Sequence, residues 1–215
     1  MPDLADGPPG WYGKLAMLGD FAQRRLPDDV VRACDQWLAT TMHALPQVLG
    51  ERWPWGYLEA PLLRFACAPG VFDADWWFGV LMPSCDNVGR YFPLWIAQPC
   101  AGPPQDAAGL DRLAQWYEAL VRAAVHTLED GASVVQFEAQ LADITPWHAA
   151  GGKACDPQSL AVALALLSIH ARAPRLDGCT FWWPTTRQSG RAVPLRVVRS
   201  FPSVEALAQL LLSDG

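Results

Sequence analysis

Residues 79–94 read GVLMPSCDNVGRYFPL, and this stretch decides the fold. An apolar run ends at Pro83, a polar tip carries Ser84 and Asp86, and a second apolar run follows Gly89. Two apolar runs separated by a short segment with Pro, Asn and Gly are typical of a hairpin-like pair of strands. Glycine allows a positive φ at no steric cost, and short polar side chains bond to nearby backbone amides. The stretch therefore predicts two buried strands joined by a loop of defined shape, with charged groups at its tip.

Three apolar runs, at residues 62–68, 76–82 and 91–97, include the two on either side of this loop. The connections between them, of about seven or eight residues, are too short for helical crossovers, so the runs should form an antiparallel meander. The runs are apolar at nearly every position, which indicates that both faces of the sheet are covered. We therefore predict an α/β fold, a three-layer α-β-α sandwich with a mixed, mostly antiparallel sheet.

Apolar residues recur at intervals of three and four in the segments outside these runs, which predicts amphipathic helices. The first helix should either stop near Leu45 or kink at Pro46, with Gly50 as its terminal cap. Ser133 and Gln136 form a capping-box pattern at the start of another helix. The remaining elements expected are helices at 110–128, 133–141, 159–170 and 203–212, and strands at 11–15, 179–184 and 192–199.

The chain has 215 residues, of which 51% are hydrophobic and 18% charged, so it can bury a sizeable core. Eleven tryptophans predict a core rich in aromatic rings. The pairs Trp76-Trp77 and Trp182-Trp183 should place one indole on each face of a strand. We expect a flexible N-terminal segment at residues 1–9 and a single domain at residues 10–215. Within it, residues 105–170 could form a helical sub-lobe.

The formal net charge is −6, and the sixteen basic residues are scattered along the chain. This pattern argues against electrostatic binding to nucleic acid or to an anionic membrane surface. The first ten residues lack the basic and apolar regions of a secretory signal. The longest apolar span, residues 160–169, has about half the length that a bilayer requires. We therefore expect a cytoplasmic protein without membrane insertion, whose partner is another protein.

No residue pattern predicts a metal site, a cofactor or a catalytic centre. The six cysteines form no CxxC pair and lie far from the four histidines, so buried free thiols are favoured over disulfides or zinc ligation. Lys14 follows Gly13 as in a phosphate-binding loop, but Leu15 stands where that motif needs Ser or Thr. Ser84 has neither a GxSxG elbow nor a histidine base in a comparable motif. We therefore expect a protein that is not an enzyme.

Three separated motifs occur in order along the chain: WYGKLAMLGDFAQRRLP at residues 11–27, LRFACAPG at 63–70 and LMPSCDNVGRYFPL at 81–94. Together they resemble the TagF family, also called ImpM, and residues 181–212 resemble it more weakly. TagF-like proteins are cytoplasmic accessory proteins that repress bacterial type VI secretion after translation. The resemblance implies a partner that is a scaffold with a forkhead-associated domain. It also implies a mechanism in which binding sequesters a component of the secretion assembly.

Six motif residues are candidates for partner binding or for a ligand cleft: Asp20, Arg24, Arg64, Ser84, Asp86 and Arg90. If the strands pair as predicted, the strand ends near Arg64 and Arg90 would approach the turn at Asp20. One interpretation is a structural network of ion pairs that ties the loops to the sheet. The other is an anion-binding cleft, which would indicate a small-anion or phosphate-binding protein or an enzyme. Ten further motif residues are expected to determine the fold: Trp11, Gly13, Lys14, Gly19, Phe21, Pro83, Val88, Gly89, Tyr91 and Pro93.

Overall fold

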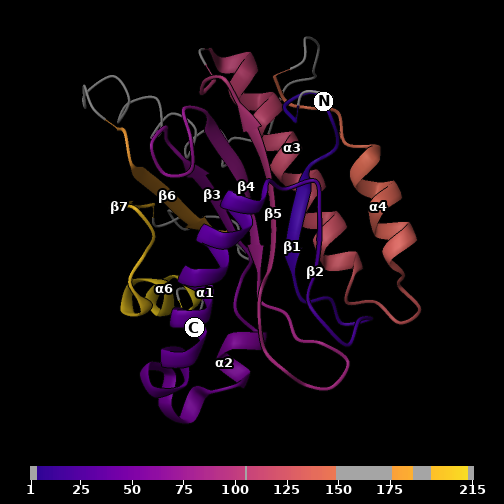
Figure 1. Cartoon of the computed structure of the whole chain (residues 1–215), viewed down its shortest axis with the longest axis vertical. Helices are drawn as coiled ribbons and strands as arrows, with labels where there is room; N and C mark the ends of the chain where they lie inside the picture. Colours follow the sequence, from indigo (N-terminus) through magenta and orange to yellow (C-terminus); the bar gives the residue numbers. More distant parts are fainter. Residues whose placement is uncertain (1–3, 105, 149–175, 186–194, 213–215) are drawn as a thin grey trace.

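The centre of the computed structural model, which describes residues 4–104, 106–148, 176–185 and 195–212, is a seven-stranded sheet of order β2-β1-β5-β4-β3-β6-β7 (Figure 1). The predicted meander of three apolar runs is confirmed as β3, β4 and β5. A mixed, mostly antiparallel sheet was expected, and all pairings between the described strands are antiparallel. The strands are β1 (Gly10–Gly13), β2 (Ala22–Arg24), β3 (Leu63–Cys67), β4 (Trp76–Met82), β5 (Leu94–Cys100), β6 (Cys179–Pro184) and β7 (Arg196–Arg199).

Helices cover both faces of the sheet, which confirms the predicted three-layer α/β fold. Successive side chains of a strand point to opposite faces. Phe65 therefore packs in a core with α1 and α6, whereas Ala66 packs in a second core with α3 and α4. The helices are α1 (Asp28–Leu49), α2 (Trp55–Leu58), α3 (Ala107–His126), α4 (Val134–Ala142) and α6 (Val204–Leu211), with a 3-10 turn at Gly50–Arg52.

Both cores are rich in aromatic rings, as the composition predicts. Trp77 and Trp182 lie in the core under α1 and α6, and their chain neighbours Trp76 and Trp183 lie in the other core. Each tryptophan pair thus divides its indoles between the two faces, as expected. In the first core the ring of Phe65 stacks on Trp95, with a centroid distance of 4.0 Å.

The helix ends follow local rules that the sequence already displays. α1 continues through Pro46 to Leu49, so a stop near Leu45 is wrong. Pro46 lies in the last turn, and its carbonyl accepts the N–H of Gly50, which has φ 55° and caps the helix as predicted. The Ser133 hydroxyl accepts the backbone N–H of Gln136, which confirms the N-cap half of the predicted capping box, and it donates to the side-chain carbonyl of Gln136 at 2.9 Å. The helix predicted at 159–170 lies outside the described residues.

Several elements differ from the predictions, among them β1, which ends at Gly13 and not at residue 15. β5 begins at Leu94 and not at residue 91, because Tyr91 makes only an isolated bridge to Cys85 and Pro93 has no N–H for a ladder. β2 pairs with β1 although its sequence, AQR, has no apolar alternation. The segment at residues 52–61, where no helix is predicted, contains the short helix α2.

The start of the chain makes specific contacts with the sheet. The side-chain amide of Gln98, a buried residue of β5, donates to the carbonyls of Ala5 at 2.8 Å and Gly7 at 2.6 Å. Arg25 donates to the carbonyl of Pro9. These bonds tie residues 5, 7 and 9 to the rest of the fold. The flexibility expected for residues 1–9 and the expected domain boundaries stay predictions. Among the helices of the described ranges, none is long and apolar enough to cross a bilayer.

Gly79 provides a test of the sheet's packing. A Cβ at this position would lie 2.0 Å from the carbonyl oxygen of Ile96 and 2.5 Å from the ring of Phe65. We expect Gly79→Ala to lower the free energy of unfolding by about 1–3 kcal/mol, because overpacking displaces neighbouring groups. Urea denaturation measures the change. Gly102→Ala is the matched control, since a Cβ there meets nothing within 4 Å, and an equal effect of both would contradict the packing argument.

Candidate functional site: the loop end of the sheet

Three segments meet at one end of the sheet: the turn between β1 and β2, the loop between β4 and β5, and α2 (Figure 1). The register causes this meeting, because Leu94 at the start of β5 pairs with both Gly13 at the end of β1 and Met82 at the end of β4. Gly13 has φ 135°, and a Cβ there would lie 2.1 Å from the carbonyl oxygen of Pro93. Glycine is therefore required where β1 leaves the sheet.

The carboxylate of Asp86 is the centre of this end. It is buried, and it forms an ion pair with the Lys14 ammonium, which is only 3% exposed. It also accepts hydrogen bonds from Arg90 Nε at 2.7 Å, from the Arg90 backbone N–H at 2.8 Å and from the Val88 N–H at 3.1 Å. Every donor that a buried carboxylate requires is thus supplied within the protein.

These bonds determine the protonation of Asp86. Burial alone raises the pKa of a carboxyl group, but the bonds from Lys14, Arg90 and Val88 outweigh that effect and hold the pKa of Asp86 well below its usual range. The carboxylate therefore stays ionised at physiological pH. It offsets the Lys14 charge, which would otherwise be buried without a partner.

Backbone bonds complete the loop. The Asp86 N–H donates to the carbonyl of Arg90 at 3.1 Å, and the Gly89 N–H donates to the carbonyl of Asp86 at 3.0 Å. Gly89 has φ 81°, which glycine adopts without strain. Arg90 Nη2 donates to the carbonyl of Gly19 at 2.5 Å and so joins this loop to the turn after β1. The prediction of a shaped loop is confirmed.

Ser84 has a structural environment. Its hydroxyl donates to the carbonyl of Lys14 at 2.9 Å, and its backbone N–H and carbonyl both bond to the Tyr57 hydroxyl of α2. Trp53 packs edge-on against Tyr91 of the same loop, with ring centroids 5.1 Å apart. Ser84 therefore links β1, the loop and α2, and its hydroxyl proton is engaged by a carbonyl instead of a base.

The other predicted site residues do not join this network through their side chains. The Asp20 carboxylate accepts the N–H of its neighbour Phe21, and exposed Arg24 donates to the carbonyl of Gln23. Arg64 lies within β3 and pairs with Glu118 of α3, on a different part of the sheet. The expectation that Arg64 approaches the turn at Asp20 is therefore wrong, whereas Arg90 does approach it.

Lys14 is the partner of Asp86 that the candidate list omitted, since it was expected only to determine the fold. The sequence does indicate that Lys14 needs an ion-pair partner, because a lysine that directly follows a buried strand requires a carboxylate if it is itself buried. The sequence alone does not identify which aspartate supplies it, since the pair is separated by 72 positions. The ammonium also lies 4.5 Å from the centroid of the Phe21 ring.

Several apolar side chains remain exposed around this network. Phe21 is 44% exposed, Trp55 67% and Val88 68%, and Leu58 is also exposed. The Arg90 side chain is 57% exposed although its Nε and Nη2 atoms are bonded. We call these five residues the loop-end surface. Tryptophan and arginine dominate the residues that contribute most to protein interfaces, so this composition favours protein binding.

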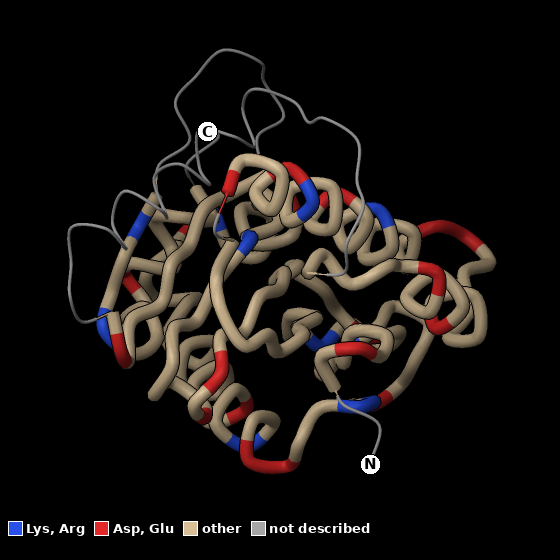
Figure 2. The backbone as a smooth tube through the Cα atoms, turned by 90° about the horizontal axis from the view of Figure 1, so that it is seen from above, with Lys and Arg blue, Asp and Glu red and all other residues tan. Residues whose placement is uncertain are grey.

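The described residues contain no group of three or more His, Cys, Asp or Glu side chains placed to hold a metal ion. Cys34, Cys67, Cys85, Cys100 and Cys179 are free thiols. Burial raises the pKa of the Cys34 and Cys67 thiols, so both stay protonated. Cys155 lies outside the described residues. Lys and Arg positions are interspersed with Asp and Glu positions around the chain (Figure 2).

The fold and the loop end together define a class, an α/β domain that presents a shaped and internally bonded loop surface. Residues 10–144 match the family described as TagF N-terminal domain, Type VI secretion system-associated, and the chain belongs to this family. Its fold is similar to the crystal structure of PA0076 from Pseudomonas aeruginosa PAO1, with a TM-score of 0.72 and 36% sequence identity. The similarity covers 96% of this chain and 95% of that one. No curated protein matches the chain.

Asp86→Asn tests the role of the buried carboxylate. We expect a clear loss of stability at neutral pH, because an amide leaves the buried Lys14 charge without a counterion. The folded-state pKa of Asp86 is lowered, so its contribution is complete above the unfolded pKa of about 3.9 and is lost as the pH falls below that value. The difference in unfolding free energy between wild type and variant should therefore shrink on acidification below about pH 4.

Urea denaturation at a series of pH values measures this difference. Asp20→Asn is the matched control, because its carboxylate is exposed and accepts only a local N–H bond. A difference between wild type and Asp86→Asn that does not depend on pH would contradict an ionised Asp86 in the folded state.

Proposed function

We propose that this type VI secretion-associated chain is a cytoplasmic, non-enzymatic repressor that acts by binding and sequestering a component of the secretion assembly. The proposed partner is a scaffold with a forkhead-associated domain, as the family resemblance implies. The observation that carries the proposal is the loop-end surface, in which exposed Trp55, Val88 and Arg90 lie around a network of buried, hydrogen-bonded groups.

The network supports binding because it lowers the entropic cost of association. Ordering a flexible loop on binding reduces affinity, whereas a loop that is already ordered avoids that cost. The bonds of Asp86 to Lys14 and to the Arg90 backbone hold this loop in one conformation before any partner arrives. Exposed apolar side chains on such a support are suited to fill pockets of a partner.

The anion-binding alternative receives less support from the geometry. Lys14 and Arg90 both pair with the Asp86 carboxylate, Lys14 is buried, and Arg64 pairs with Glu118 of α3 on a different part of the sheet. An added phosphate at the loop would also approach the Asp86 carboxylate. The structural interpretation of the ion pairs is therefore favoured over a ligand cleft.

The test measures binding of purified chain to a purified type VI scaffold with a forkhead-associated domain by titration calorimetry. We expect Val88→Asp and Trp55→Ala each to weaken binding by roughly tenfold or more, which is typical of the residues that dominate an interface. Both side chains are about two-thirds exposed, so the fold should survive. Val135→Asp is the matched control, because Val135 is 78% exposed on α4.

Equal binding of wild type and both variants would place the interface elsewhere on the chain.

Secretion assays in cells test repression itself: deletion of the chain should raise type VI secretion, and wild type should restore repression better than Val88→Asp. If deletion instead silences secretion, the chain is a structural part of the apparatus and the repressor proposal is wrong.

A further inference from the structure

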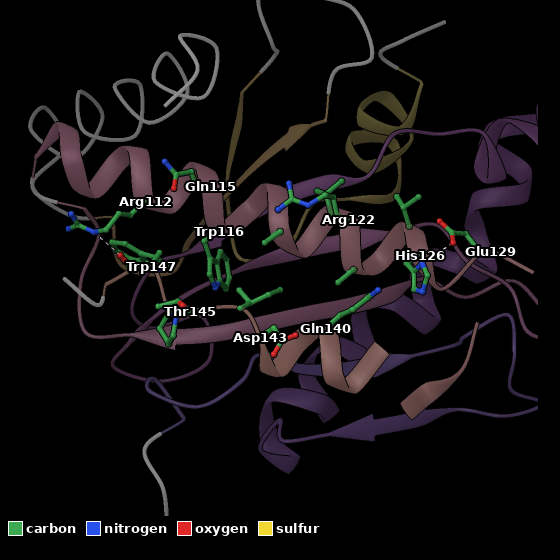
Figure 3. Close-up of a pocket in the computed structure, with 16 residues that line it drawn as sticks. Arg112, Gln115, Trp116, Arg122, His126, Glu129, Gln140, Asp143, Thr145 and Trp147 are labelled. Carbon is green, nitrogen blue, oxygen red and sulfur yellow. Dashed lines mark hydrogen bonds and ion pairs between the residues drawn. The ribbon is translucent and has the colours of Figure 1, made fainter. Parts of the chain in front are cut away.

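A cleft of about 810 Å³ lies between α3, α4 and the segment 143–147 that follows α4 (Figure 3). It is on the opposite side of the sheet from α1 and α6, and none of the five loop-end residues lines it. Its volume falls within the range of about 300–1,000 Å³ that ligand sites have. The cleft is therefore large enough to bind a molecule and independent of the proposed partner surface.

Two polar atoms in the wall of this cleft have no hydrogen-bond partner among the residues that the structure describes. They are the indole N–H donor of Trp116, a residue only 3% exposed, and the side-chain carbonyl acceptor of Gln140. Trp116 extends from α3 into the space between α3 and α4 (Figure 3). Buried polar groups are nearly always hydrogen-bonded, so an unpaired one requires an explanation. An unpaired donor and an unpaired acceptor in one cleft point to an occupant that offers both.

A peptide group is such an occupant, because its carbonyl accepts and its N–H donates. The remaining wall suits a peptide as well, since it contains apolar side chains: Ala119, Val121, Ala123, Val125, Ile144 and Pro146. These can pack against apolar side chains of a bound segment. Pockets of this kind combine a largely apolar wall with a few polar groups that fix orientation.

The charges at the rim favour an acidic segment. His126 and Glu129 pair with each other at 2.8 Å. Arg112 donates one bond, from Nε to the carbonyl of Trp147 at 3.0 Å, and its other guanidinium nitrogens have no partner among the described residues. Arg122 and Asp143 form no ion pair within the described part of the chain. The cleft lining therefore includes two arginines and one aspartate that form no ion pair with described residues, although the chain as a whole has a net charge of −6.

We propose that the cleft between α3 and α4 binds an extended, acidic peptide segment of a partner protein. A peptide group of the segment satisfies Trp116 and Gln140, its apolar side chains pack on the walls, and its carboxylates bind Arg112 and Arg122. The proposal does not depend on the function proposed for the loop-end surface.

The probe is a library of fluorescein-labelled hexapeptides with capped ends, each with two aspartates or glutamates among leucine, valine and alanine. Fluorescence anisotropy with the full chain should show saturable binding of some members. We expect Arg122→Glu to weaken that binding by roughly tenfold. Arg32→Glu is the matched control, because Arg32 is an exposed arginine of α1 on the opposite face of the sheet. The same peptides with lysine in place of the acidic residues should not bind.

A second readout reports on the unpaired donor. In a spectrum of ¹⁵N-labelled indole groups, the resonance that is lost in Trp116→Phe should shift when the peptide is added, and Gln140→Leu should weaken peptide binding. Val88→Asp should leave peptide binding unchanged, which separates this site from the loop-end surface.

Three outcomes would overturn the proposal. The first is the absence of saturable binding by any acidic peptide, and the second is binding that Arg122→Glu does not weaken. The third comes from replacing Val125, which lines the cleft, with a photo-crosslinking residue. Crosslinks within the same chain would assign the cleft to a segment of this protein, and crosslinks between two chains would assign it to a second copy.

Discussion

The structure of the loop end depends on one physical constraint. The buried carboxylate of Asp86 must be surrounded by hydrogen-bond donors. Lys14 is delivered by β1, whereas Arg90 and Val88 come from the same loop as the aspartate. The ion pair therefore forms only when β1, β5 and β4 stand side by side in the observed register, with Leu94 opposite both Gly13 and Met82. A slip of one residue would turn the strands' side chains to the wrong faces and separate the pair. The network thus depends on a correctly assembled sheet.

The same strands also join the two helical layers. Because β3, β4 and β5 are buried on both faces, each residue that packs against α1 and α6 has chain neighbours that pack against α3 and α4. Gly79 shows how little space remains, since Phe65 occupies the volume that a side chain there would need. Tyr117 of α3 donates from its hydroxyl to the backbone carbonyl of Phe65 at 2.5 Å, so one layer is bonded to a strand that the other layer covers.

Much of this architecture could be predicted from sequence, because it rests on local rules. Apolar runs identified the central strands, and the patterns at Gly50 and Ser133 identified helix ends. The site was only partly predictable, because it depends on pairings between distant segments. Asp86 and Arg90 were found through their shared loop, whereas Lys14 approaches Asp86 only through the strand register. Arg64 was placed wrongly, because its partner Glu118 belongs to a helix whose position over the sheet no local pattern reveals.

Unpaired polar atoms have different meanings in different parts of this fold. The indole N–H of Trp95 is also unpaired, but its ring is stacked against Phe65 and lies among the rings of Trp37, Trp182 and Phe201. Dispersion and apolar burial around a large ring offset one unmade hydrogen bond there. Trp116 differs, because its ring borders a cleft whose wall also holds an acceptor and guanidinium nitrogens that have no partner in the described part of the chain. Close packing explains the unpaired N–H of Trp95. A bound peptide segment would explain the unpaired N–H of Trp116 together with the unpaired polar groups beside it.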